Sequence, residues 1–188
     1  MLFRSRELYA VDLLVGHVFK KLEDTGERGN TLAFFLSDNG YLWGDHGLLG
    51  KSLPYVPGVQ LPFYMRGPGV PNGRPSGHLV ANTDIAPTIF DATGITPGYQ
   101  PDGRSLLGSD QRDWLLVESP TGARRARDWK PWNAYLSKRR EYIRWKGGFV
   151  EDYDLRTDPW QLDASNHPRP AIEQQVKQAR ACAGSSCP

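Results

Sequence analysis

The chain has 188 residues, a formal net charge of +2, 39% hydrophobic residues and 23% charged residues. This composition is typical of a folded globular protein and argues against intrinsic disorder. The small net charge gives no reason to expect a nucleic-acid partner, because the basic clusters at 124–127 and 138–140 are interpreted as solvated loop or hairpin faces. No apolar run approaches the ~20 residues of a membrane span, and residues 1–6 do not form a signal peptide.

The first part of the chain alternates between helical and extended patterns. Apolar residues at helical spacing predict a helix over 6–24, with Gly26 just after its end. The short apolar segment 31–36 is bounded by polar residues, which indicates a strand buried on both faces of a parallel sheet. Asp84 is predicted to cap a further helix that Gly94 ends. This helix is predicted at 85–93, and two further strands are predicted at 61–66 and 114–118.

After residue 119 the chain changes character, and short alternating segments rich in aromatic residues begin. Gly147 and Gly148 signal a hairpin turn within this part. The predicted elements are three strands and a polar helix, at 134–136, 142–145, 149–155 and 171–181. We therefore expect two domains. Residues 1–119 belong to an α/β layer, and residues 120–188 form a small antiparallel sheet with a terminal helix and a cysteine tail.

Aromatic residues are frequent in the second predicted domain. At the spacing of Trp129, Trp132 and Tyr135, a packed subdomain core is the favoured interpretation, with a sugar-binding rim as the alternative. The cysteines of the chain are Cys182 and Cys187, at its C-terminal end. A local disulfide between them is expected, which favours an oxidising compartment; two free thiols in the tail are the alternative.

The chemistry-bearing residues of the first part gather in one glycine-rich loop. Asp38 and Asn39 follow the predicted strand 31–36, at the carboxyl end where ligands bind in open parallel sheets. Carboxylate and amide oxygens are hard ligands that suit Ca²⁺ or Mg²⁺, but two oxygens do not complete a calcium shell. The alternative is an Asp-Asn-Gly turn without function.

The continuation of the loop adds groups that suit an anion. Lys51 offers a compact positive charge to a sulfate or phosphate oxygen. His46 can donate to the same anion or to a leaving oxygen. The glycines between these residues allow a ligand to approach the backbone closely.

The segments 34–51 and 62–70 together resemble the second half of sulfatases, in the branch of N-acetylglucosamine-6-sulfatase and iduronate-2-sulfatase within the alkaline phosphatase superfamily. The resemblance includes 9–12, 83–94, 102–106 and 153–159, so it spans nearly the whole chain in family order. It implies the C-terminal part of an alkaline-phosphatase-like α/β domain, with a parallel or mixed sheet between helices, followed by a small antiparallel subdomain.

The resemblance also implies roles for individual residues. Asp38 and Asn39 match the calcium ligands of the family. Lys51 matches the lysine that contacts the substrate sulfate, and His46 matches the histidine that assists the leaving oxygen. The implied cofactor is Ca²⁺, with Mg²⁺ as the alternative. Three further family positions are expected to be structural: Asp84, Asp102 and Asp154.

The nucleophile that the resemblance implies is absent from this chain. Sulfatases use a formylglycine made from the first residue of a Cys/Ser-x-Pro/Ala-x-Arg motif. Cys182 and Cys187 have other neighbours, and the segment 52–56 has Val56 where the motif needs arginine. The family's N-terminal Asp-Asp calcium ligands have no counterpart either. We therefore expect the C-terminal portion of a sulfatase, inactive alone, whose partner is the N-terminal half.

Two alternatives stay open. One is a phosphodiester or phosphonate monoester hydrolase of the same superfamily, and the other is a non-catalytic remnant or pseudoenzyme. The expected substrate is a carbohydrate or other small-molecule sulfate ester. The parent protein is expected to be extracytoplasmic, because members of the family are often exported and the cysteine tail favours an oxidising compartment.

Overall fold

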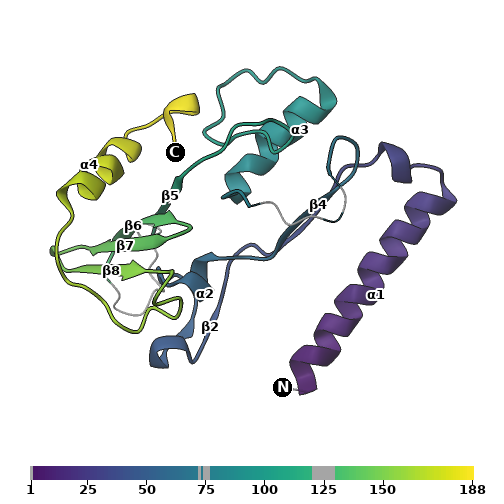
Figure 1. Cartoon of the computed structure of the whole chain (residues 1–188). Coiled ribbons are helices and arrows are strands. Elements are labelled where there is room, and N and C mark those ends of the chain that lie inside the picture. Colours follow the sequence, from purple (N-terminus) through teal and green to yellow (C-terminus); the bar gives the residue numbers. More distant parts are fainter. Residues whose placement is uncertain (1, 72, 74–76, 120–129) are drawn as a thin grey trace. The chain divides into compact units, whose positions relative to one another are not determined.

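The computed structural model describes residues 2–71, 73, 77–119 and 130–188 (Figure 1). These residues form two compact units. The first unit comprises the described residues within 1–35 and 63–74, and the second comprises those within 36–62 and 75–188.

A long helix and a two-stranded sheet make up the first unit. Helix α1 spans Leu2–Asp24, a short 3₁₀ turn spans Arg28–Asn30, and strands β1 (Ala33–Leu36) and β4 (Phe63–Arg66) form the sheet. The predicted end of the helix is confirmed, and Gly26 follows it with a φ of 75°. Edge-to-face packing of two phenylalanine rings, one from each strand, joins β1 and β4.

Much of the apolar surface of this unit is exposed. Leu8 and Val18 of α1 have exposed fractions of 68% and 51%. The prediction that segment 31–36 is buried on both faces is wrong for this chain, because Phe35 is 43% exposed. The physical reason is that β4 is the one described strand beside β1, so few described side chains cover this sheet.

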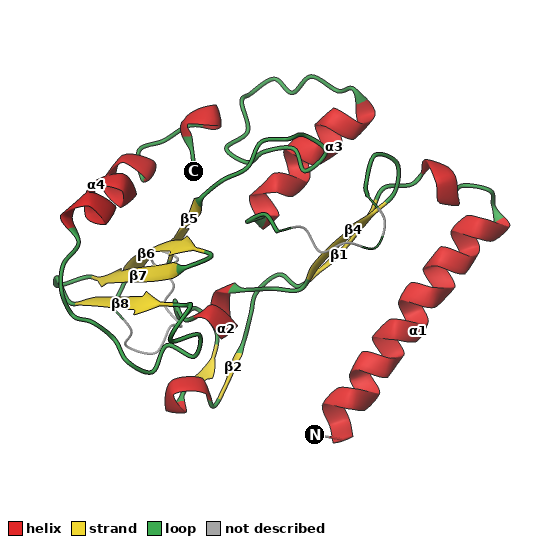
Figure 2. Ribbon diagram, viewed as in Figure 1, coloured by secondary structure: helices red, strands yellow, loops and turns green. Residues whose placement is uncertain are grey.

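The second unit contains a four-stranded antiparallel sheet with the strand order β5-β6-β7-β8 (Figure 2). Its strands are Trp114–Glu118, Trp132–Ser137, Arg140–Trp145 and Val150–Asp154. Gly147 and Gly148 have positive φ angles in the turn between β7 and β8, as the hairpin signal predicts. Strand β5 pairs with β6, so the predicted strand 114–118 lies in the same sheet as strands expected for the second domain. The domain division at 119 stays a prediction.

Short elements and two further helices complete the second unit. They are β2 (Leu42–Trp43), β3 (Leu49–Gly50), α2 (Val56–Val59), α3 (Ile85–Thr93), α4 (Pro170–Ala179) and three 3₁₀ turns at Asp45–Gly47, Asn82–Asp84 and Gly184–Ser186. Helix α3 has the predicted bounds, and Gly94 follows it with a φ of 68°. None of the described helices combines the length and apolar content needed to cross a bilayer.

Asp84 has a structural role that differs from the predicted helix cap. Its side chain makes no capping hydrogen bond to α3. Instead, Asp84 is 1% exposed and accepts two hydrogen bonds from the Arg112 guanidinium, at 2.5 and 2.8 Å. It also accepts the backbone N–H groups of Ala81 and Arg104. The carboxylate therefore ties together three separate segments of the unit.

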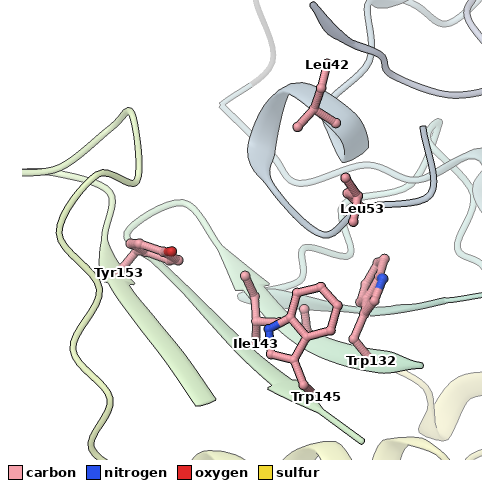
Figure 3. Close-up of a cluster of buried hydrophobic side chains, with 7 residues drawn as sticks. Leu42, Leu53, Trp132, Ile143, Trp145 and Tyr153 are labelled. Carbon is pink, nitrogen blue, oxygen red and sulfur yellow. The ribbon is translucent and has the colours of Figure 1, made fainter. Parts of the chain in front are cut away.

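The hydrophobic core of the second unit joins the loop 37–62 to the sheet. Leu42 and Leu53 pack with side chains of the sheet, namely Trp132, Ala134, Ile143, Trp145 and Tyr153 (Figure 3). Burial of each large apolar side chain stabilises the fold by about 1.5–3 kcal/mol. The interpretation of Trp132 as a core residue is confirmed, whereas Trp129 lies outside the described residues. The sheet is thus the support on which the loop rests.

A disulfide joins Cys182 to Cys187 after α4, as expected. The small loop that it closes is fixed to the segment 102–104. Asp102 Oδ1 accepts the backbone N–H of Gly184 at 2.7 Å, and the Arg104 guanidinium donates to the Cys187 carbonyl at 3.0 Å. Asp102 is therefore a structural residue in this chain, as the resemblance implied.

Candidate functional site

A short hairpin brings two of the predicted site residues together. Strands β2 and β3 pair with Leu42 opposite Gly50, and the chain then returns toward the residues that precede β2. Lys51 Nζ donates a hydrogen bond to Asn39 Oδ1 at 2.9 Å, across 12 positions of sequence. The structure therefore joins the predicted anion-binding lysine to a predicted cation ligand by a hydrogen bond.

Close backbone packing holds the start of this loop. The N–H groups of Gly40 and Tyr41 donate to the carbonyls of Gly58 and Pro57, at 3.2 and 3.1 Å. A Cβ atom on Gly40 would lie 2.3 Å from the Pro57 carbonyl oxygen. Only glycine fits this position without a shift of the backbone, which explains the Asn-Gly pair.

The side chains of Asp38 and Asn39 fit part of a hard-cation site. Asn39 Nδ2 donates to the Gly40 carbonyl at 3.0 Å, which fixes the amide and leaves Oδ1 to face Lys51. Asp38 is exposed, and its carboxylate has no hydrogen bond or ion pair among the described residues. The described residues contain no cluster of three or more His, Cys, Asp or Glu side chains that could hold a metal. Further ligands would have to come from elsewhere, as the sequence predicts.

His46 lies at the tip of the hairpin, in a different environment from Lys51. Its backbone has a φ of 54°, and its imidazole stacks on the ring of Tyr55 with a centroid distance of 3.9 Å and an interplanar angle of 19°. Among the described residues, this stack on Tyr55 is the ring contact of His46, and no hydrogen bond or ion pair joins His46 to Asn39 or Lys51.

A buried polar cluster lies under Tyr55. The Tyr55 hydroxyl donates to Glu151 Oε1 over a long 3.5 Å, and the Tyr153 hydroxyl donates to Glu151 Oε2 at 3.2 Å. Gln161 accepts the backbone N–H of Val56 at 2.7 Å and donates from Nε2 to the carboxyl of Glu141. The segment 55–56 is therefore held by polar side chains from β7, β8 and the chain that follows them.

Burial shifts the pKa values of this cluster. Burial raises the pKa of Glu141 from 4.5 to about 8; the hydrogen bond from Gln161 opposes this, and the nearby Glu151 adds to it. Burial also raises the pKa of Glu151, while hydrogen bonds from neighbouring side chains act in the opposite direction. The pKa values of Tyr55 and Tyr153 are raised by burial first and then by the charge of Glu151. Both hydroxyls therefore stay protonated and act as donors.

Backbone strain is concentrated around the same loop. Among the described non-glycine residues, the positive φ angles belong to His46, Ser52 and Gln161. Each such conformation costs on the order of 1–3 kcal/mol and persists only where the surroundings enforce it. Ser52 follows Lys51, and its carbonyl accepts the indole N–H of Trp132 at 3.1 Å. The strain therefore lies at the tip, the exit and the buried support of the candidate site.

The nucleophile of the family does not fit any described residue. Both cysteines are joined in the disulfide. Ser52 is followed by Leu53 and Pro54, which are buried, and the motif arginine is replaced by Val56. The described residues thus bring together Asn39 of the predicted cation site and Lys51 of the predicted anion site.

Solved structures share this fold. The phosphonate monoester hydrolase of Agrobacterium radiobacter is 26% identical, with a TM-score of 0.72, over 91% of this chain and 37% of that protein. A protein solved in complex with its substrate D-glucosamine-2-N,6-O-disulfate has a TM-score of 0.72 at 22% identity, over 93% of this chain and 37% of that one. The chain thus has part of an alkaline-phosphatase-like α/β fold, which confirms the predicted fold class.

Sequence comparisons narrow this class to a family. Residues 4–95 match the Sulfatase family. The human N-acetylglucosamine-6-sulfatase is 42% identical over 127 residues, which cover 62% of this chain and 23% of that protein. A relative from Drosophila melanogaster, the extracellular sulfatase SULF-1 homolog, is 40% identical over 55% of this chain and 9% of its own length. These matches support a member of the sulfatase family over part of this chain, and the aligned residues span less than a quarter of the length of these two relatives.

Proposed function

We propose that this chain carries the cation- and sulfate-binding loop of a sulfatase that hydrolyses sulfate esters. In this proposal Asp38 and Asn39 hold Ca²⁺, or alternatively Mg²⁺, and Lys51 and His46 act on the sulfate group. The observation that carries the proposal is the 2.9 Å contact between Lys51 Nζ and Asn39 Oδ1. This contact puts the charge that suits an anion beside the oxygen that suits a cation.

In the proposed site, Lys51 has one partner before the cation binds and another after it binds. When bound, a hard divalent cation would polarise the sulfate ester as a Lewis acid. Lys51 would give up its bond to Asn39 once that oxygen ligates a cation, because two positive charges repel strongly at this separation. Its ammonium group, which is exposed, would then be free to donate to a sulfuryl oxygen.

His46 is proposed to hold a proton for the leaving oxygen. Its ring is half-buried against Tyr55, so its orientation is restricted before substrate arrives. The nucleophile would come from outside the described residues. The proposed partner of this chain is accordingly the remaining part of a sulfatase domain. Apolar residues of α1 such as Leu8 and Val18 are exposed, which supports the proposal that another protein surface covers the first unit.

The proposed substrate class is a sulfated amino sugar. The human relative is named for N-acetylglucosamine-6-sulfate hydrolysis, and one structural neighbour was solved with a disulfated glucosamine. We further propose an extracytoplasmic location. The disulfide supports it, because such bonds persist in oxidising compartments, and the Drosophila relative is named extracellular.

Turnover by a chimera tests this function. The chain replaces the matching segment of human N-acetylglucosamine-6-sulfatase, and hydrolysis of N-acetylglucosamine-6-sulfate is measured. Lys51→Ala is expected to lower kcat by about 100-fold to 1000-fold, the typical loss for one group that stabilises developing charge. Lys177→Ala is the matched control, because Lys177 is an exposed lysine on α4. Equal losses in the two variants, or none in Lys51→Ala, would contradict the proposal.

A second candidate function is hydrolysis of phosphonate monoesters. The observation that favours it is the structural match to the Agrobacterium radiobacter phosphonate monoester hydrolase, which equals the best of the described matches in TM-score. Both functions use a tetrahedral anion, so Lys51 and His46 would serve either. The ratio of kcat/KM values for matched sulfate and phosphonate esters in the chimera separates them, and the sulfatase proposal expects the sulfate ester to be preferred.

A further inference from the structure

The stack between His46 and Tyr55 joins the candidate site to the antiparallel sheet. Tyr55 is half-buried and packs against the core cluster that contains Leu42 and Leu53. Its hydroxyl points to Glu151 of β8, and the next backbone N–H, that of Val56, is accepted by Gln161. The ring under the imidazole is therefore fixed by packing and by hydrogen bonds at the same time.

We propose that Tyr55 is a positioning residue for His46, and that the buried cluster of Glu141, Glu151 and Gln161 holds this tyrosine in place. The inference rests on the proposed function, because it assigns to Tyr55 the task of orienting the proton donor of that reaction. Tyr55 itself is not placed in contact with substrate. It acts through the imidazole that it supports.

The cluster has features that ordinary core packing does not need. Gln161 is 1% exposed and has a φ of 58°, and its two side-chain bonds bridge Val56 to Glu141. Glu141 is fully buried, and its Oε1 has no hydrogen-bond partner among the described residues. Burying such groups is costly unless they are hydrogen-bonded, and the bonds that they make here specify one local arrangement. The arrangement that they fix here is the backbone at 55–56, directly under His46.

The left-handed backbone of His46 makes this support necessary. A histidine at the tip of a two-stranded hairpin would otherwise sample several rotamers and leave its strained conformation. Parallel stacking at 3.9 Å limits the imidazole to one plane. The plane of the imidazole is thus set by a residue of the second unit.

NMR of the full chain tests the positioning directly. Histidine is selectively labelled with ¹³C, and the His46 signals are identified by their loss in His46→Asn. In the unmodified chain we expect ring-to-ring NOEs between His46 and Tyr55 and a ring-current displacement of the His46 signals. Tyr55→Leu is expected to remove both, and Tyr55→Phe to restore them, because the ring is retained. Tyr153→Phe is the matched control, since it removes a hydroxyl from the same carboxylate without touching the stack.

Missing NOEs in the unmodified chain would overturn the inference without any variant. Unchanged His46 signals in a folded Tyr55→Leu protein, or equal effects of Tyr153→Phe and Tyr55→Leu, would also overturn it. In the chimera, Tyr55→Leu is expected to lower kcat by about 10-fold to 100-fold with little change in KM, and Tyr55→Phe to restore it. If the NMR results hold while Lys51→Ala leaves turnover unchanged, the proposed function fails and the positioning of His46 by Tyr55 stands.

Discussion

Replacement of Glu141 by glutamine is expected to remove a pH dependence from the stability of the second unit. Burial raises the folded-state pKa of Glu141 to about 8, from 4.5 in an exposed carboxyl. Between these pH values the folded state keeps a proton that the unfolded state has lost. The contribution of Glu141 is therefore fully present below about pH 4.5 and is lost as the pH rises through about 8.

The size of this effect follows from the same pKa values. At about 1.4 kcal/mol for each pH unit between 4.5 and about 8, the full loss is on the order of 5 kcal/mol. Glu141→Gln carries no titrating proton, and its amide oxygen can still accept the hydrogen bond from Gln161. The variant should thus resemble the unmodified chain at pH 5 and be more stable than it at pH 9.

Urea unfolding at pH 5, 7 and 9 measures this difference. Trp132 and Trp145 lie in the core of the unit, so their fluorescence reports its unfolding. At a urea dependence of about 2 kcal/mol/M, the midpoint of Glu141→Gln should exceed that of the unmodified chain by about 2.5 M at pH 9. Glu7→Gln, an exposed site on α1, is the control and should show no such gain. Urea midpoints of Glu141→Gln and the unmodified chain that change in parallel with pH would contradict the raised pKa of Glu141.

Three further predictions concern activity, a buried ion pair and a glycine. The chain alone is expected to hydrolyse no chromogenic aryl sulfate in the presence of Ca²⁺, and steady-state turnover above a Lys51→Ala control would contradict this. Arg112→Met leaves the buried Asp84 carboxylate unpaired and should cost about 3–5 kcal/mol in urea unfolding, a loss that a merely surface-exposed pair would not give. Gly40→Ala places a Cβ against a backbone carbonyl and should cost about 1–3 kcal/mol, whereas Gly29→Ala meets open space and should cost less than 1 kcal/mol.

Local patterns in the sequence predict most of the elements. Helix α3 has its predicted bounds because Gly94 adopts the left-handed conformation that ends a helix. The strands β5 to β8 follow from alternating segments and from the paired glycines of their last turn. The burial of these elements is predicted less well. An apolar segment such as 31–36 indicates a covered strand, but only a neighbouring structure can cover it, and Phe35 is exposed in this chain.

The candidate site is likewise predictable from the sequence only in part. The spacing of Asn39 and Lys51 in a glycine-rich loop predicts their proximity, and the structure brings them to 2.9 Å. The support under His46 is not predictable from local pattern, because Tyr55 and Glu151 are 96 positions apart. One signal was present. Glu141 and Ile143 are two positions apart and share one face of β7, so a carboxyl occupies a position where a core side chain is expected.

A calcium titration tests whether the loop 38–51 binds the cation of the proposed site. Amide resonances of the ¹⁵N-labelled chain are followed during a Ca²⁺ titration, and the same titration is made with Asp38→Asn and with Asp110→Asn, an exposed carboxylate elsewhere in the unit. We expect saturable shifts at Asp38, Asn39 and Lys51, with a Kd of about 1 mM or weaker because two protein oxygens form only part of a calcium shell. Asp38→Asn should abolish them and Asp110→Asn should not. Shifts that are absent, or that survive in Asp38→Asn, would contradict the assignment of this loop as the cation-binding wall of a sulfatase site.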